Sequence, residues 1–346
     1  MSIETLSTDY LIAGTGAVGM AFADVILSET DAHITMVDLH DKPGGHWNDA
    51  YPFVTLHQPS SFYGVSSREL SRGQIDTIGL NKGLYDLASG AEVGAYFDAV
   101  MREQFLPTGR VQYFPNTEYL GDGAFRSIVS GKRYQAEVRR KTVDATFLKT
   151  TVPSTHTPGF DIAPDANLIP INELAKLRKT PAGYVIIGGG KTGIDACLWL
   201  LQNQVDPDQI RWIMPRDAWL IDRANTQPNM DFFASTMGAQ ANQMEAIAKA
   251  DSLDDLFARL EQAGVLLRID PAVQPKMFHA ATVSKLELEA LQQIRHIVRQ
   301  GRVTHLGRNE ITLEQGSLAT GPEYLHVDCA TEWPCLHFQK KLLLKI

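Results

Sequence analysis

The chain has 346 residues, of which 44% are hydrophobic and 21% charged, as in an ordinary globular protein of about two domains. Its net charge of −8 excludes a basic surface, so neither nucleic acid nor a membrane is an expected partner. The three cysteines form no Cys-x-x-Cys pair, and no cluster has metal-ligand spacing, which excludes a zinc ribbon and a redox disulfide motif. Without a leader pattern or a long apolar stretch, the chain is expected to be cytoplasmic.

The first predicted unit begins with a buried strand at residues 10–13, a glycine-rich turn and a helix. A second strand, residues 33–37, ends at Asp38, which lies 19 residues beyond the last glycine of the turn. This spacing is typical of a dinucleotide site, in which the turn holds the pyrophosphate and the acid binds a ribose. The alternative for Asp38 is a solvated acid at a strand end. The residues expected to hold the pyrophosphate are Gly14, Gly16, Ala17, Val18 and Gly19.

A glycine pair, Gly44-Gly45, comes next and is followed by His46 and Trp47. Paired glycines let the backbone pass close to a ligand, and a tryptophan can cover a flat ring. We therefore expect Gly45, His46 and Trp47 to contact the cofactor, the alternative being a surface turn with one buried aromatic. Residues 51–64 have the composition of an irregular loop over a site. Within it His57 is a catalytic candidate, and a structural histidine is the alternative.

Residues 92–105 are expected to form a helix, and short strands are expected between residues 111 and 146. They would complete a first domain over residues 1–150. A segment rich in proline and threonine follows and predicts a linker over residues 151–180.

A second glycine turn opens the next unit, after the apolar strand 184–187 and before an apolar helix. It is not a phosphate-binding P-loop, because that motif requires a glycine where Val185 stands. Its context is again that of a dinucleotide site. The residues expected to bind this second dinucleotide are Gly188, Gly190, Lys191, Thr192 and Gly193.

The partner strand, residues 210–214, ends in Pro215-Arg216 rather than in an acid. An arginine there suits a 2′-phosphate, so we favour NADPH over NADH, although Asp217 could pair with Arg216 instead. Arg223 is the candidate for a catalytic charge near the nicotinamide or the flavin. The alternative is a surface ion pair with Asp222.

The remaining chain completes a nucleotide domain over residues 181–328. Residues 225–300 are expected to be a mainly helical insertion that covers a site or makes a subunit contact, as in a homodimer. Strands are expected to return at 303–306, 310–313 and 324–328. The predicted fold class is therefore α/β, with two Rossmann-like dinucleotide-binding domains.

Taken in this order, the motifs resemble those of the flavin-containing and Baeyer–Villiger monooxygenases. The resemblance covers about residues 8–330 and is carried by the two glycine turns, Asp38, the Gly44-Gly45-His46-Trp47 segment and Arg216. It implies FAD on the first turn and NADPH on the second. It also implies that NADPH reduces the flavin and that molecular oxygen is used on a small organic substrate.

Two departures from this family pattern leave other functions open. The family's linker signature, Phe-x-Gly followed by a histidine and an aromatic, is absent from residues 152–160. This favours an alternative, an NADPH-dependent flavin reductase or dehydrogenase without oxygen insertion. The resemblance also implies a return to the FAD domain, here over residues 329–346, yet only 16 residues follow Ala330. We therefore expect a truncated chain or a partly open flavin pocket, and a third alternative is a non-catalytic nucleotide-binding protein.

Overall fold

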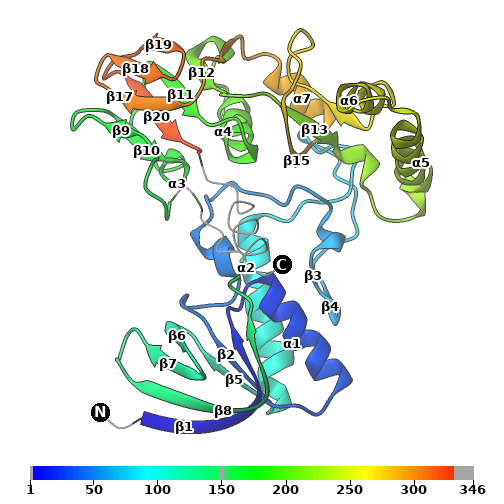
Figure 1. Ribbon diagram of the computed structural model, residues 1–346, viewed down its shortest axis with the longest axis vertical. Helices are drawn as coiled ribbons and strands as arrows, with labels where there is room; N and C mark the ends of the chain where they lie inside the picture. Colours follow the sequence, from blue (N-terminus) through cyan, green and yellow to red (C-terminus); the bar gives the residue numbers. More distant parts are fainter. Residues whose placement is uncertain (1–2, 148–151, 153, 331–346) are drawn as a thin grey trace.

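The computed structural model describes residues 3–147, 152 and 154–330. Two α/β units lie at opposite ends of the molecule, the N-terminal one at the bottom of Figure 1 and the second one at the top. The expected fold class is confirmed. Residues 331–346 of the expected return segment, 329–346, and part of the expected linker lie outside the described residues.

The first unit contains a six-stranded sheet in the order β5-β2-β1-β8-β7-β6. Strands β1, β2, β5 and β8 run parallel, while β6 and β7 form an antiparallel extension. Leu11 and Ile12 of β1 are fully buried, as expected for a central strand covered on both faces. The bounds are β1 (Ile3–Ala13), β2 (Ile34–Val37), β5 (Val111–Phe114), β6 (Thr117–Gly121), β7 (Ala124–Ser127) and β8 (Arg133–Asp144).

Helices α1 (Ala17–Glu29) and α2 (Gly90–Ala99) belong to this unit. A capping box between Ser89 and Glu92 starts α2, which continues as a π-helix, η3 (Val100–Phe105). The helix expected over residues 92–105 is therefore confirmed, as are the short strands after it. A small hairpin, β3 (Gly64–Val65) and β4 (Arg68–Glu69), lies beside α1.

The second unit contains a five-stranded, fully parallel sheet in the order β10-β20-β11-β12-β16. Every residue of its central strand β11 (Gly183–Ile187) is buried, which explains the apolar run before the second glycine turn. Helix α4 (Lys191–Gln202) follows β11 and packs on the sheet. The other strands are β10 (Leu168–Pro170), β12 (Ile210–Ile213), β16 (His296–Val298) and β20 (Tyr324–Asp328).

Part of the expected linker belongs to this second unit. Strand β10 pairs with β20, and β9 (Asp161–Ile162) pairs with β17 (Val303–Leu306). The short helix α3 (Ile171–Leu174) continues from β10. The composition of residues 151–180 did not indicate β9 or β10, because these strands have only two and three residues. β17 continues through β18 (Glu310–Leu313) to β19 (Gly316–Ala319), and the expected strands 303–306, 310–313 and 324–328 are confirmed.

The segment expected as a helical insertion is mixed rather than mainly helical. It contains α5 (Phe233–Lys249), α6 (Leu253–Gln262) and α7 (Lys285–Leu291), with α5 and α6 at the right of Figure 1. It also supplies two strands of a small sheet, in which β13 (Ala218–Asp222) lies between β14 (Leu266–Leu267) and β15 (Met277–Val283). None of the helices in the described part of the chain is long and apolar enough to cross a membrane.

The two units share part of a hydrophobic core. Tyr51 and Val54 of the first unit belong to the same buried cluster as Tyr184 and Ile186 of β11. The Phe53 ring stacks on Trp199 of α4, with ring centroids 4.9 Å apart. The aromatic loop that begins at residue 51 therefore docks on the helix that follows the second glycine turn.

Candidate functional site

The first glycine turn connects β1 to α1 at the carboxyl edge of the first sheet. Gly16 is the N-cap residue of α1 and has no side chain to cap the first N–H groups of this helix, which lack an acceptor within the helix. A Cβ atom at Gly19 would overlap the carbonyl oxygen of Gly14, so glycine is required there for the helix to approach the strand. This is the geometry in which a helix N-terminus receives a phosphate.

Asp38 follows β2 and lies directly beside this turn. One carboxylate oxygen accepts hydrogen bonds from the backbone N–H and the hydroxyl of Thr15, at 2.5 and 2.7 Å. The other accepts from the backbone N–H of His40 at 2.8 Å and faces His40 Nδ1 at 2.9 Å. Although burial opposes ionisation, these hydrogen bonds together lower the pKa of Asp38. Asp38 is thus a buried, ionised acid at the turn and not a solvated one.

An unused polar group lies next to Asp38. The Tyr113 hydroxyl, on the neighbouring strand β5, is buried and has no hydrogen-bond partner among the described residues. Burial raises the pKa of Tyr113, the nearby Thr15 hydroxyl acts in the opposite direction, and Asp38 raises it further. Buried hydroxyls normally have a partner, so this one fits a ligand hydroxyl that binds beside the acid.

The Gly44-Gly45 pair also lies at the first turn. The Gly44 N–H donates to the carbonyl oxygen of Thr15 at 2.9 Å, and a Cβ atom at Gly45 would lie 2.9 Å from the Cα atom of Gly16. Gly45 therefore has to be glycine because its backbone packs closely against the first glycine turn of the protein itself. Trp47 donates from Nε1 to the Tyr63 hydroxyl at 2.6 Å, and His46 stacks on the Trp47 ring.

The second glycine turn repeats the arrangement of the first between β11 and α4. Gly190 is the N-cap of α4 and has no side-chain cap, and a Cβ atom at Gly193 would overlap the carbonyl oxygen of Gly188. Trp212 of β12 donates from Nε1 to that carbonyl oxygen at 2.8 Å. Thr192 is the second residue of α4 and is partly buried. The two expected turns thus have the same local geometry.

Two glycines at these turns have no structural reason to be glycine. Gly16 and Gly190 have backbone angles that any residue can adopt, with φ of −74° and −85°. Among the described residues, a Cβ atom at Gly190 would meet nothing within 4 Å, and one at Gly16 would make only an ordinary contact at 3.5 Å. Glycine at both positions fits a ligand that approaches each helix N-terminus from outside the protein.

Lys191, the first residue of α4, forms an ion pair with Asp195 one turn later. Tyr51 of the first unit donates from its hydroxyl to Asp195 at 2.5 Å. Both side chains of the ion pair are only 11% exposed. A lysine at the positive end of a helix is electrostatically unfavourable unless an anion lies nearby, and Asp195 is that anion here.

Arg216 follows β12 at the carboxyl edge of the second sheet, and its side chain is exposed. Its carbonyl oxygen would lie 3.5 Å from a Cβ atom at Gly189, so the arginine and the turn are neighbours. Asp217 does not pair with it, because a forked hydrogen bond from Arg299 at 2.8 and 3.0 Å occupies that carboxylate. Within the described residues no carboxylate forms an ion pair with Arg216, which leaves its guanidinium available to a phosphate.

His57 lies where the two units meet. Burial is the main cause that lowers its pKa to about 3, and the nearby Lys191 and Arg223 cations act in the same direction. The ring is therefore neutral at physiological pH. It can offer a hydrogen-bond donor and an acceptor, but no charge, to a ligand between the units.

Arg223 has partners that the sequence did not predict. Its side chain is 1% exposed, and it pairs with Glu287 at 2.8 Å rather than with Asp222. It also donates to the carbonyl oxygen of His57 at 2.8 Å and to the Asn81 side chain at 3.1 Å. The alternative for Arg223, a surface ion pair with Asp222, is therefore wrong. The guanidinium connects the two units instead of facing open space.

The site contains residues that sequence reasoning missed: His40, Asp49, Tyr113 and Asp195. His40 follows the strand-end acid by two residues, a position with no recognised spacing. Asp195 sits four residues after Lys191, and this ion-pair spacing could have revealed it. Tyr113 is brought to the site only by the pairing of β5 with β2.

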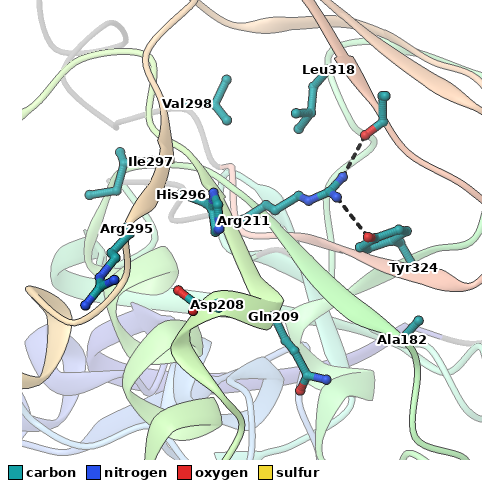
Figure 2. Close-up of a pocket in the computed structure, with 11 residues that line it drawn as sticks. Ala182, Asp208, Gln209, Arg211, Arg295, His296, Ile297, Val298, Leu318 and Tyr324 are labelled. Atoms are coloured by element: carbon teal, nitrogen blue, oxygen red, sulfur yellow. Dashed lines mark hydrogen bonds between the residues drawn. The ribbon is translucent and has the colours of Figure 1, made fainter.

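A cavity of about 600 Å³ lies elsewhere, at the amino ends of the second sheet (Figure 2). Arg211 crosses it and donates to the carbonyl oxygen of Ala319 at 2.7 Å and to the Tyr324 hydroxyl at 2.8 Å. Ligands of open parallel sheets bind at the carboxyl ends of the strands, where both glycine turns lie. This cavity is therefore separate from the two glycine turns.

Three mycobacterial relatives cover most of this chain, and each is named an uncharacterized protein. An uncharacterized protein of Mycobacterium tuberculosis is 52% identical over 329 residues, which is 95% of this chain and 61% of the relative. The chain thus spans 61% of the length of these three mycobacterial relatives. No protein-family model matches the chain.

Solved structures are similar over most of the chain. Cyclohexanone monooxygenase from Rhodococcus sp. Phi1 bound to NADP+ has a TM-score of 0.56 at 13% identity, covering 96% of this chain and 71% of that one. An oxidized steroid monooxygenase bound to NADP has a TM-score of 0.55 at 13% identity, covering 93% and 71%. The likeness confirms the expected resemblance at the level of the fold: this chain has the fold of these monooxygenases.

Proposed function

We propose that the protein is an FAD-dependent oxidoreductase whose flavin is reduced by NADPH. The observation that carries this proposal is the pair of glycine turns at the carboxyl edges of two parallel sheets, with an acid at one strand end and an exposed arginine at the other. An acid selects a free ribose hydroxyl, and an arginine selects a 2′-phosphate. The first turn is thus assigned to FAD and the second to NADPH. The corresponding domains are proposed to be residues 1–150 and 181–328, with residues 161–174 of the intervening segment packed on the second.

Bound FAD would supply the redox chemistry by accepting a hydride from NADPH. The N-terminus of α1 would hold its pyrophosphate at Gly14–Gly19, and Asp38 and the Tyr113 hydroxyl would receive a ribose. On the second turn, Gly188–Gly193 would hold the pyrophosphate of NADPH. Arg216 would bind the 2′-phosphate, because its guanidinium is exposed and its neighbour Asp217 is already paired with Arg299.

Residues between the units would orient the two cofactors. Phe53 stacked on Trp199 and the buried Tyr51 exclude water from the side of the interface next to α4. The neutral His57 ring would hydrogen-bond a cofactor ring without adding charge to it. Arg223 would hold His57 in place through its carbonyl oxygen.

Oxygenation of a small organic substrate is the finer proposal. Its support is the fold shared with cyclohexanone and steroid monooxygenases. The rival is a flavin reductase without oxygen insertion, and the absence of the linker signature from residues 152–160 favours it. An oxygenated product with little peroxide would support the monooxygenase, and peroxide alone would support the reductase.

The first experiment is an absorbance spectrum of the purified protein before and after anaerobic addition of NADPH. A yellow protein whose flavin absorbance bleaches with NADPH, and bleaches more slowly with equal NADH, is the expected result. A colourless protein that binds no added FAD and consumes no NADPH would overturn the proposal in favour of a non-catalytic nucleotide-binding protein.

Replacing Arg216 by alanine tests the second cofactor. We expect the KM for NADPH to rise by about ten- to a hundred-fold, since hydrogen bonds to charged groups contribute about 1.5–3 kcal/mol. The KM for NADH should change by less than about two-fold, because NADH lacks the phosphate. Arg295→Ala, an exposed arginine at the opposite edge of the same sheet, is the matched control. Equal effects of Arg216→Ala on both cofactors would contradict the assignment.

A further inference from the structure

His40 lies between two carboxylates at the edge of the first sheet. Its Nδ1 atom is 2.9 Å from Asp38 Oδ1, and its Nε2 atom is 2.8 Å from Asp49 Oδ2. An ionised carboxylate can only accept hydrogen bonds, so both ring nitrogens must carry a proton for both contacts to be hydrogen bonds. The geometry therefore describes an imidazolium cation between two anions.

This cation connects the two ends of the segment that carries the glycine pair. Asp38 directly follows β2, and Asp49 is the last residue of the short 3-10 helix η1 (Gly45–Asp49). Between them, Gly45 lies against Gly16 of the first glycine turn. The backbone of His40 is held independently, since its carbonyl oxygen accepts from the Asn116 N–H at 2.9 Å. The ring thus joins Asp38, beside the first glycine turn, to the end of the short helix that begins at Gly45.

We propose that His40, as an imidazolium, is a positioning residue for the dinucleotide on the first turn, and that loss of its proton weakens the binding of that dinucleotide. The inference rests on the proposed assignment of FAD to this turn. The cation balances the charge of Asp38 and keeps that carboxylate ionised and oriented beside the ribose position. Without it, Asp38 and Asp49 would stand at the two ends of one loop with no positive charge between them, and they would repel each other.

The direction of the pH dependence follows from the same contacts. The hydrogen bond to Asp38 is the largest cause that raises the pKa of His40, to about 9, and Asp49 adds to it while burial opposes it. The titratable groups that face the ring are Asp38 at the end of β2, with Asp49 and His46 on η1. Because the pKa of His40 is raised, the charged ring contributes its full stabilisation below pH 6.5, the pKa of histidine in the unfolded chain. This stabilisation is lost as the pH rises through about 9.

The test is a titration of the flavin-free protein with FAD, followed by flavin fluorescence, between about pH 6 and pH 10.5. For the natural protein, we expect the dissociation constant to be steady up to about pH 8 and then to rise at least about five-fold by pH 10. His40→Gln should bind FAD with the weaker, high-pH affinity throughout and should lose this rise. Asp49→Asn should move the rise to lower pH, because one of the two anions is gone while Asp38 remains.

His33→Gln is the matched control, since His33 is an exposed histidine next to the amino end of the same strand β2. The FAD dissociation constant of His33→Gln should depend on pH as that of the natural protein does, including any change that comes from titration of FAD itself. Identical slopes for the natural protein and His40→Gln would overturn the role of His40 while leaving the FAD assignment intact. Failure of the natural protein to bind FAD at pH 7 would overturn the FAD assignment itself. A purely structural His40 would lower the unfolding temperature of the variant without changing its FAD profile.

Discussion

Gly193→Ala is expected to destabilise the second unit by more than about 3 kcal/mol, whereas Gly190→Ala leaves its stability nearly unchanged and removes dinucleotide binding. The two glycines lie three residues apart in one turn, but their surroundings differ. A Cβ atom at Gly193 would overlap the carbonyl oxygen of Gly188, so backbone must move against backbone. A Cβ atom at Gly190 meets none of the described residues within 4 Å. A ligand bound at this helix N-terminus would meet the new methyl group.

Thermal unfolding and NADPH fluorescence titration separate the two effects. Gly193→Ala should lower the unfolding temperature, and Gly190→Ala should keep that temperature while NADPH affinity falls by at least about ten-fold. The first turn offers a matched pair, since Gly19 corresponds to Gly193 and Gly16 to Gly190. Gly16→Ala should therefore lose FAD and keep NADPH. Full NADPH affinity in a stable Gly190→Ala protein would show that no pyrophosphate binds at this helix end.

The local parts of the site could be predicted from the sequence. Both glycine turns, Asp38 and Arg216 are fixed by strand–turn–helix–strand patterns whose residues are close in sequence. The buried strands at residues 10–13 and 184–187 were visible for the same reason, because an apolar run records burial on both faces of a parallel sheet. Because each turn follows the end of a parallel strand, the same patterns place these residues at the carboxyl edges of the two sheets.

Contacts between distant segments could not be predicted. Arg223 is held by Asn81 and Glu287, which lie 142 and 64 residues away in the chain. The pairing of β10 with β20 also joins distant segments, and β10 is only three residues long. The His40 bridge is short in sequence, but no periodic pattern marks a histidine between two acids. These contacts cannot be predicted from a single sequence, because they form only when the segments are brought together in the folded protein.

Arg223→Met is expected to lower the free energy of unfolding by about 3–5 kcal/mol, which is the cost of leaving a buried charge without its partner. The uncompensated group would be Glu287, whose side chain is 11% exposed. The carbonyl oxygen of His57 and the Asn81 side chain would lose a donor at the same time. Methionine has a similar length and retains much of the packing, so the loss reports on the charge and the hydrogen bonds. Arg223→Lys should recover only part of the lost free energy of unfolding, because one ammonium group cannot reproduce the planar set of donors of a guanidinium.

The double variant Arg223→Met/Glu287→Gln separates a positioning role from a catalytic one. If Arg223 positions the two units, removing the buried anion should restore part of the stability, and the rate of flavin reduction by NADPH should recover in parallel. Arg259→Ala, at an exposed ion pair on α6, is the matched control and should change the free energy of unfolding by less than about 1 kcal/mol. A catalytic cation would behave differently. Arg223→Met would then slow flavin reduction at unchanged stability, and Glu287→Gln would not restore the rate.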